Sequence, residues 1–280
     1  MEHFTFTKPG GKWNEDRVYS CDDFAFVLDG ATCLTGEHFT TYNSDAEWYS
    51  NWWCEYLKTE LKNTQKTIPE ILKSGIKEVT TEFKKFAGNN KIKDYPSSTV
   101  SIVRRLEGGV LEIYTITDSS ILVLSKTGIF EIIQEQSNHV KDAFTIMQLH
   151  SLALNENITL MQSNKKYTQI VADARVNKNK FAPSGYFVLA DSEEAIEHGI
   201  YSKVDESLID KILILSDGYS RVYDVIKFMT AEKLIRKINN LKDAEKIYNK
   251  LKKLQEKDSF AKKHFRFKVS DDASLAYMKF

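Results

Sequence analysis

Acidic residues stand at the ends of several short apolar runs in this chain. Four of them follow or shortly precede such a run: Asp29, Asp118, Asp217 and Asp271. Apolar runs of about five residues bounded by turn residues are typical of buried strands, so each acid is expected at the end of a strand. Carboxylate oxygens are the ligands that Mg²⁺ and Mn²⁺ prefer in proteins. The pattern therefore predicts an oxygen-ligand metal centre.

Two of these acids belong to Asp-Gly dipeptides: Asp29-Gly30 and Asp217-Gly218. An isolated Asp-Gly usually marks a tight turn between two strands. A turn that only reverses the chain would lead at once into a matching strand. Neither residues 31–36 nor residues 219–221 read as such a strand. Both dipeptides are therefore interpreted as candidate ligand positions.

The composition limits the class of protein. The chain has 280 residues, of which 42% are hydrophobic, and this is ample for a substantial core. Its formal net charge of zero argues against broad electrostatic binding of nucleic acid. No apolar run is long enough for a membrane span, and residues 1–3 do not begin a signal peptide. The sequence therefore predicts a soluble, cytoplasmic protein that binds neither nucleic acid nor a membrane.

The charge is unevenly distributed along the chain. Residues 232–268 contain thirteen Lys or Arg residues and five Asp or Glu residues. A solvated helical face would explain this excess, and a docking surface for an acidic partner would explain it as well. The sequence leaves both interpretations open.

Cysteine and histidine give no sign of a disulfide framework or a zinc site. The three cysteines lack C-x-x-C spacing and lie in or beside apolar segments: Cys21, Cys33 and Cys54. They are expected to be reduced thiols in or near the core. The six histidines show no H-x-x-x-H pattern, so a metal held by this chain is expected to be a hard one.

The hydrophobic periodicity predicts an α+β fold in a single domain covering residues 1–280. Strands are expected at 3–7, 17–21, 24–28, 98–106, 110–116, 121–124, 129–133, 186–190, 212–216 and 273–278, and helices at about 44–61, 67–87, 140–154 and 232–254, the last broken near residues 239–240. Residues 98–133 are expected to form one antiparallel meander, because their connections are too short for crossover helices. This order favours a sandwich of sheets with helix pairs packed outside.

Six short motifs occur in an order that resembles a known family. They are Asn14-Glu15-Asp16, Asp29-Gly30, Ser97-Ser98-Thr99, Asp118-Ser119, Ser216-Asp217-Gly218 and Asp271-Asp272. No single motif is specific, but the six together resemble the metal-dependent protein phosphatases, that is, protein phosphatase 2C, in a divergent, bacterial-like form. The resemblance implies a four-layer αββα sandwich, in which helix pairs flank two packed antiparallel sheets.

The resemblance also implies a role for each acid. Asp29 would bridge two divalent cations, and the carbonyl group of Gly30 would contact the second of them. Asp217 and Asp271 would complete the shell of the first cation.

The resemblance assigns the remaining acidic residues to the second and third cation positions. Asp16, alone or together with Glu15, would hold the second cation, and Asp118 would serve an optional third. The cations would be Mg²⁺ or Mn²⁺, two or three in number. They would activate a shared water for attack on a phosphoryl group, with no covalent intermediate.

Some positions depart from the pattern of the family. The family commonly has an arginine that contacts phosphate, and here the nearest upstream base is Lys12. Lys12 is therefore predicted to contact phosphate. The predicted catalytic set consists of Lys12, Asp29 and Asp217. Ala31 occupies the place of a histidine that is proposed as general acid in many members, and His38 is a possible substitute. Thr117 and Ser120 replace the usual residues around Asp118, which makes the third cation position the least typical.

Three functions are compatible with these residues. The leading one is a Mg²⁺- or Mn²⁺-dependent phosphoserine and phosphothreonine phosphatase that acts on phosphoproteins. A catalytically weak or inactive relative with a regulatory or binding role is the main alternative. A metal-dependent phosphodiesterase or nuclease is disfavoured by the zero net charge.

Overall fold

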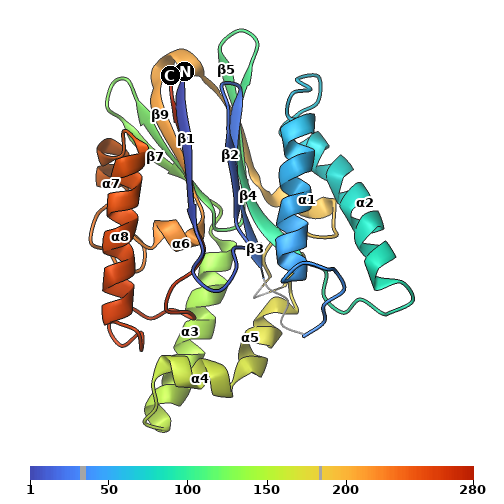
Figure 1. Ribbon diagram of the computed structural model, residues 1–280, viewed down its shortest axis with the longest axis vertical. Coiled ribbons are helices and arrows are strands. Elements are labelled where there is room, and N and C mark those ends of the chain that lie inside the picture. The colour runs from blue at the N-terminus through green and yellow to red at the C-terminus, as the bar shows by residue number, and fades with distance from the viewer. Residues whose placement is uncertain (32–35, 183–184) are drawn as a thin grey trace.

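Two antiparallel sheets form the centre of the molecule (Figure 1). Over residues 1–31, 36–182 and 185–280, which the computed structural model describes, ten strands form two five-stranded sheets of order β1-β10-β9-β6-β7 and β2-β3-β4-β5-β8. The strands are β1 (Glu2–Lys8), β2 (Arg17–Ser20), β3 (Phe24–Ala31), β4 (Ser97–Leu106), β5 (Val110–Ile116), β6 (Ser120–Ser125), β7 (Phe130–Ile133), β8 (Ile200–Asp205), β9 (Ile209–Leu215) and β10 (Ala273–Lys279).

Helices cover both outer faces of the sandwich. The helices are α1 (Asp45–Glu60), α2 (Ile68–Ala87), α3 (Ser137–Asn155), α4 (Leu160–Lys166), α5 (Thr168–Arg175), α6 (Asp217–Ser220), α7 (Ala231–Lys237) and α8 (Leu241–Lys257), with short 3₁₀ turns η1 (Glu194–His198) and η2 (Glu206–Leu208). Helices α1 and α2 pack outside the sheet of β3, and α7 and α8 pack outside the sheet of β1, whereas α3, α4 and α5 lie at the end opposite the two chain termini (Figure 1). The predicted four-layer sandwich with its helix pairs is confirmed.

Alternation along β3 shows how the layers are built. Phe26 and Leu28 belong to the core cluster under α1 and α2, while Ala25 and Val27 belong to the cluster between the two sheets. Successive side chains of a strand point to opposite faces. Asp29 therefore continues the inward-facing set and carries its carboxyl group into the space between the sheets.

The space between the sheets becomes polar toward this end. Ser101 and Thr115 share a hydrogen bond of 2.6 Å between their hydroxyl groups on adjacent strands, and the hydroxyl groups of Thr99 and Ser119 share another. Asp29 is the registered partner of Thr99 across the β3–β4 ladder. The interior thus offers hydroxyl and carboxyl groups at the end of the sandwich where α3 and α5 lie.

Several predicted elements are confirmed. Ser44 is the N-cap of α1, and its hydroxyl accepts from the amide of Glu47 at 3.0 Å. Thr67 begins α2 with a full capping box to Glu70. The predicted break near residues 239–240 separates α7 from α8.

The predicted meander over residues 98–133 is wrong. Strands β4 and β5 pair in one sheet, whereas β6 and β7 belong to the other. The chain crosses between the sheets at Thr117, which adopts a left-handed φ of 71°, and at Asp118. Short connections exclude crossover helices, but they do not exclude a step from one sheet to the facing one. This crossing is what places Asp118 at the polar end of the sandwich.

The predicted strand at 186–190 is also wrong. This segment forms only isolated bridges, Ser98 with Leu189 and Lys178 with Tyr186. The fifth strand of its sheet is instead β8, which pairs with β5. β8 is an edge strand with exposed and half-buried residues, so it lacks the apolar run by which buried strands are recognised.

Two other sequence predictions concern cysteines and membrane spans. Cys21 and Cys54 are free thiols, and Cys33 lies outside the described residues. In the described part of the chain, no helix combines the length and the apolar character needed to cross a bilayer.

A buried ion pair ties the α1–α2 connection to the sheet. Arg104 of β4 donates to the carboxylate of Glu112 on β5 at 2.9 Å, and both side chains are 1% exposed. The same guanidinium donates to the carbonyl groups of Leu61, Asn63 and Lys66. Glu112 in turn accepts from the amide of Ile68, the first residue of α2. The pair therefore fixes the turn that joins the two helices.

We expect Arg104→Leu to lower the free energy of unfolding by about 3 to 5 kcal/mol, because it leaves the buried charge of Glu112 without its positive partner. Urea denaturation measures this change. The neighbouring Arg105→Leu is a matched control, since Arg105 pairs with Glu206 at the surface and should cost about 1 kcal/mol or less. Equal losses in the two variants would show that burial of the pair is not what matters.

Candidate functional site

A cavity of about 570 Å³ opens between the polar end of the sandwich and helices α3 and α5. The acidic residues on its wall are Asp29, Asp118, Asp142, Asp217 and Asp271. The basic residues on its wall are Lys141, Lys165, Arg175, Arg221 and Lys268. Four aspartates that the sequence singled out, at the ends of separate strands, therefore share one cavity. A cavity with both acids and bases suits an anionic ligand held beside cations.

Close backbone packing explains the two glycines that follow aspartates in this cavity. A Cβ atom on Gly30 would lie 2.7 Å from the carbonyl oxygen of Glu15, and one on Gly218 would lie 1.9 Å from that of Asp272. Real Cβ atoms do not approach backbone oxygens so closely, so no other residue fits without movement of the chain. Each glycine lets a distant segment pack directly against the strand end that carries the aspartate.

Asp271 is held by two basic side chains. Nη2 of Arg221 donates to Asp271 Oδ2 at 2.7 Å and lies 3.9 Å from a carboxylate oxygen of Asp217. Nζ of Lys268 donates to Asp271 Oδ1 at 3.0 Å. Burial alone would raise the pKa of Asp271, but the positive charges of Arg221 and Lys268 hold it below its ordinary value. Asp271 is therefore ionised and already partly neutralised by the protein itself.

Asp16 shows the opposite behaviour. Its side chain is buried, and within the described residues neither of its carboxylate oxygens has a hydrogen bond of good geometry, although the hydroxyls of Ser274 and Ser216 lie near enough to lower its pKa somewhat. Burial, followed by the charges of Asp272 and Asp271, raises the pKa of Asp16 to about 7. Buried polar atoms normally have partners, and an exception requires an explanation. A cation bound against Asp16 would supply the missing partner.

Asp29 and Asp217 are likewise destabilised as anions. Loss of hydration raises the pKa of each well above its usual value. The charges of Asp16 and Asp217 add to the effect at Asp29, and the charge of Asp271 adds to it at Asp217. This pattern of crowded carboxyl groups in a cavity is typical of a functional site.

The side chains as they stand do not form a finished cation cage. Among the described residues, no group of three or more His, Cys, Asp or Glu side chains is positioned to hold a metal ion. The carboxyl groups surround the cavity, and Arg221 and Lys268 draw Asp271 toward themselves. The donor set, all carboxylate, still fits a hard divalent cation, and so do the unpartnered oxygens of Asp16.

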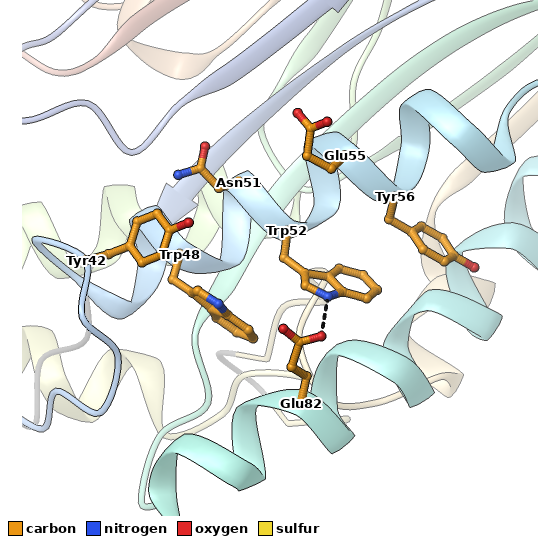
Figure 2. A pocket seen from close by; sticks show the side chains of 7 residues that line it. All are labelled: Tyr42, Trp48, Asn51, Trp52, Glu55, Tyr56 and Glu82. Carbon is orange, nitrogen blue, oxygen red and sulfur yellow. Dashed lines mark hydrogen bonds between the residues drawn. The ribbon is translucent and has the colours of Figure 1, made fainter.

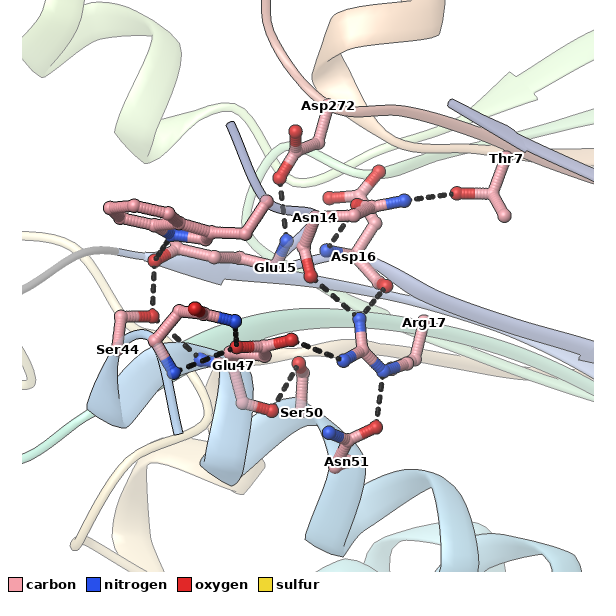
Figure 3. Close-up of polar contacts among 12 residues, drawn as sticks. Thr7, Asn14, Glu15, Asp16, Arg17, Ser44, Glu47, Ser50, Asn51 and Asp272 are labelled. Carbon is pink, nitrogen blue, oxygen red and sulfur yellow. Dashed lines mark hydrogen bonds and ion pairs between the residues drawn. The ribbon is translucent and has the colours of Figure 1, made fainter. Parts of the chain in front are cut away.

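The segment that carries Asp16 is fixed by Asp272. One carboxylate oxygen of Asp272 accepts from the amide of Gly10 at 2.7 Å. The other accepts from the amide of Glu15 at 2.6 Å (Figure 3). Of the pair Asp271-Asp272, the first residue thus faces the cavity and the second anchors the loop before β2. The sequence named the pair but gave no sign of this division of roles.

Arg17 completes the support of the same loop. Its guanidinium donates to the carbonyl groups of Asn14 at 2.8 Å and Asp16 at 2.6 Å, and also to the side chain of Asn51 on α1 (Figure 3). Glu15 accepts hydrogen bonds from Trp13 Nε1 and from the hydroxyl of Ser44. Arg17 and Glu15 therefore act as links between the loop and α1, and the prediction that Glu15 assists with the second cation stays untested.

Asp118 reaches the cavity through an unusual backbone. Thr117 is β-branched, and its left-handed φ of 71° is rare for such a residue; its hydroxyl donates to the carbonyl of Phe187 at 2.8 Å. The carboxylate of Asp118 accepts from Nδ2 of Asn138 on α3. Asp118 thus links the crossing between the sheets to the helices over the cavity. A third cation at Asp118 stays a prediction.

The structure also shows where Lys12, Ala31 and His38 lie relative to the cavity. Lys12 does not line the cavity among the described residues, and its ammonium lies 6.0 Å from the centre of the Trp13 ring. Ala31 lines the cavity, whereas Nε2 of His38 lies 3.7 Å from a carboxylate oxygen of Asp45, outside the wall. Lys12 as a phosphate contact stays a prediction without structural support.

Two basic residues at the site were missed as site elements from the sequence, although a signal was present. Arg221 stands four residues after Asp217, and Lys268 stands three residues before Asp271. Spacings of three or four residues are those at which acids and bases meet on a helix or turn.

Comparisons with known proteins agree with this geometry. The sequence model of the family described as Protein phosphatase 2C matches residues 10–257. No curated protein matches the chain in sequence.

Solved structures give a wider match. The chain is similar to the serine/threonine phosphatase Stp1 from Staphylococcus aureus, with 14% identity, a TM-score of 0.57 and coverage of 100% of this chain and 94% of that one. It is similar to the Mycobacterium tuberculosis phosphatase PstP/Ppp, with 14% identity, a TM-score of 0.57 and coverage of 100% and 98%. A structure of the PstP catalytic domain with two manganese ions gives 13% identity, a TM-score of 0.57 and coverage of 99% and 96%. At this level of identity, the likeness establishes the fold.

We expect the cation-free protein to lose stability as the pH rises from about 4 to about 7, the interval between the ordinary and the raised pKa of Asp16, and Asp16→Asn to lose less. The raised pKa of Asp16, about 7, means that the folded state binds a proton more tightly than the unfolded chain does. Its contribution is therefore present at low pH and disappears as the pH passes 7. Melting curves in EDTA at several pH values measure this. An identical pH dependence in Asp16→Asn and the wild type would contradict the assignment.

Proposed function

Since the chain belongs to the protein phosphatase 2C family of serine/threonine phosphatases, we propose that it hydrolyses phosphoserine and phosphothreonine esters of proteins with a water activated by two divalent cations. The family and the enzyme class predicted from the sequence motifs are confirmed by the family match over residues 10–257. One observation carries the proposal for the site. It is the buried Asp16, whose two carboxylate oxygens lack a hydrogen-bond partner among the described residues, beside carboxyl groups whose pKa values are raised by burial and then by mutual repulsion.

The carboxyl groups of the cavity, together with Asp16, which is buried and does not line the cavity itself, would hold the cations, which we take to be Mg²⁺ or Mn²⁺. Asp29, Asp217 and Asp271 are assigned to the first, and Asp29, Asp16 and the Gly30 carbonyl to the second. Asp118 is kept as the residue for an optional third. When bound, such cations supply a water of lowered pKa and neutralise phosphoryl oxygens.

Arg221 is our candidate for the group that binds phosphate. Its Nη2 is held by Asp271, while its Nη1 is buried and has no hydrogen-bond partner among the described residues. The guanidinium also lines the cavity. A planar guanidinium can donate two parallel hydrogen bonds to a phosphoryl group, which an ammonium cannot do. Asp271 therefore positions Arg221, and Arg221 offers its second nitrogen to the substrate.

Further basic residues suit the entrance of a phosphoprotein. Lys141, Lys165 and Arg175 lie on the wall formed by α3, α4 and α5. Nζ of Lys141 lies 3.1 Å from a carboxylate oxygen of Asp142 and 3.9 Å from the centre of the Tyr186 ring. These charges would attract a dianionic phosphate group without contributing to the chemical step.

A weak or inactive relative remains the alternative function. It is favoured by the ion pairs of Asp271 with Arg221 and Lys268, because a cation must compete with them for this carboxylate. The two functions differ in turnover and agree in cation binding. A phosphatase assay on phosphopeptides and on a small aryl phosphate, with EDTA, Mg²⁺ and Mn²⁺ compared, separates them.

Two broader parts of the proposal concern the whole chain. We take residues 1–280 as one catalytic domain, supported by structural matches that cover 99% or more of the chain. The basic segment 232–268 includes α7 and α8, and Lys242, Lys246, Lys250 and Lys253 share one exposed stretch of α8. An acidic partner at this helix stays a prediction.

We expect Asp29→Asn and Asp217→Asn to reduce turnover at least about a hundredfold, because each removes an anionic ligand from the site. Mn²⁺ in millimolar excess should raise the melting temperature of the wild type, since ligands of the native state stabilise it, and should raise that of Asp29→Asn less. Asp22→Asn, an exposed change on the loop before β3, is the control. Full activity in EDTA, or unchanged turnover in both site variants, would exclude the proposed mechanism.

The phosphate contact can be tested by comparing Arg221 with Lys12. Arg221→Lys keeps the charge but loses the fork, and it should raise KM for an aryl phosphate roughly tenfold. It should weaken inhibition by inorganic phosphate to a similar extent. Lys12→Ala should change neither quantity if Arg221 is the contact. The reverse result would return the role to Lys12.

A further inference from the structure

A second concave surface lies on the outer side of the molecule, on helices α1 and α2. It is a shallow groove of about 490 Å³. Its wall consists of aromatic, acidic and amide side chains: Tyr42, Trp48, Asn51, Trp52, Glu55, Tyr56 and Glu82 (Figure 2). None of these residues takes part in the cavity that holds Asp29. The groove is therefore a separate feature that the proposed catalytic function does not use.

The aromatic rings of the groove are held in place. The rings of Trp52 and Tyr56 stack with centres 5.0 Å apart and an angle of 14° between their planes. Nε1 of Trp52 donates to Oε2 of Glu82 at 2.9 Å across the gap between the helices (Figure 2), and the hydroxyl of Tyr56 donates to the carbonyl of Ile71 at 3.1 Å. Trp48 is buried and packs against Phe83. The wall is thus rigid before any ligand binds.

The groove is also electrically negative. Glu82 makes no ion pair within the described part of the chain, and only one of its oxygens is used by Trp52. Loss of hydration, together with the nearby charges of Glu78 and Glu60, raises the pKa of Tyr56. Glu55, which points away from α2 in Figure 2, pairs with Lys58 at 2.6 Å. Of the two carboxylates on the wall, Glu82 is therefore the one without an ion-pair partner among the described residues, although Lys77 and Lys85 line the adjoining hollow with it.

We propose that this groove binds the guanidinium of an arginine exposed on a phosphoprotein substrate. Aromatic faces attract cations, tryptophan most strongly. A planar guanidinium can stack on such a ring while it donates to a carboxylate in the ring's plane, and it is more weakly hydrated than an ammonium. Trp52 with Glu82 offers that combination. The carboxylate is aligned in advance by the indole N–H, which leaves Oε1 of Glu82 for the ligand.

The position of α1 connects the groove with the catalytic cavity. The carbonyl oxygen of Ala46, in the first turn of α1, would lie 3.1 Å from a Cβ on Gly30. Trp48 belongs to the same end of α1, and Trp52 and Tyr56 follow at intervals of four residues along one face. An extended peptide could therefore reach from the cavity to the groove over the start of α1. This choice of occupant depends on the proposed phosphatase function.

Binding can be tested without catalysis. The probe is a short neutral peptide with one arginine and no phosphate, compared with the same peptide carrying citrulline or lysine. The indole N–H signal of Trp52 in ¹H–¹⁵N NMR, identified with Trp52→Phe, reports on the groove. We expect the arginine peptide to shift this signal and the citrulline peptide to bind at least about fivefold more weakly, since citrulline keeps the shape and lacks the charge.

A charge-neutral variant supplies the second comparison. Glu82→Gln keeps a carbonyl oxygen for the indole N–H and should weaken arginine binding roughly fivefold. Glu245→Gln, an exposed change of the same charge on α8, should leave binding unchanged. Equal binding of the arginine and citrulline peptides, or equal binding by the wild type and Glu82→Gln, would overturn the proposal. A shift of the Trp52 signal with protein concentration alone would assign the groove to a second copy and also overturn it.

Kinetics then connects the groove with the substrate. A phosphopeptide with arginine should have a kcat/KM at least about fivefold above that of its citrulline counterpart, and Glu82→Gln should remove the difference while hydrolysis of a small aryl phosphate is unchanged. If no substrate is hydrolysed but the unphosphorylated arginine peptide binds, the phosphatase proposal fails and the groove remains an arginine site. If both phosphopeptides are hydrolysed equally, the substrate docking fails and the phosphatase proposal stands.

Discussion

Repulsion among carboxyl groups at one end of the sandwich is the constraint on which the rest of the site depends. Asp16, Asp29, Asp217 and Asp271 come from four segments, and burial together with the charge of at least one other member raises the pKa of the first three. Bringing anions into a space with little water costs free energy unless cations or protons accompany them. The protein supplies part of the compensation through Arg221 and Lys268. Some negative charge remains uncompensated, above all at Asp16, and a divalent cation would neutralise it.

Tight backbone packing is what keeps these anions together. Gly30 and Gly218 allow the segments of Glu15 and Asp272 to approach the two strand ends without side chains between them. The carboxylate of Asp272 accepts hydrogen bonds from two backbone amides of the loop before β2. The apolar layer between the sheets, with members such as Val27 and Ile214, stabilises an arrangement that the carboxyl groups by themselves would oppose. The middle of these strands therefore supplies the apolar contacts that stabilise the fold, and the ends of the same strands carry the aspartates of the site.

The catalytic cavity and the α1–α2 groove have opposite chemistry. The catalytic cavity combines carboxylates with a basic wall and suits a phosphate group beside cations. The α1–α2 groove combines aromatic rings with the carboxylate of Glu82, which has no ion pair among the described residues, and suits a cationic side chain. Helix α1 adjoins both, since its first turn packs beside Gly30 and its outer face carries the aromatic residues. A substrate with a phosphate and a nearby arginine would be complementary to both surfaces at once.

The sequence by itself determined what depends on local pattern. Alternation and capping residues predicted β1, β3, α1, α2 and the break between α7 and α8, because strand and helix periods and caps are properties of neighbouring residues. The order of short motifs predicted the aspartates that meet in the cavity. Only the tertiary structure decided that β4–β5 and β6–β7 lie in different sheets, that β8 rather than residues 186–190 forms the edge strand, and that Arg221, not Lys12, lies against the carboxylates. These outcomes depend on contacts between segments far apart in the chain, such as the pairing of Arg221 with Asp271. Such contacts produce no periodic pattern of residue types in the sequence, so the sequence alone does not predict them.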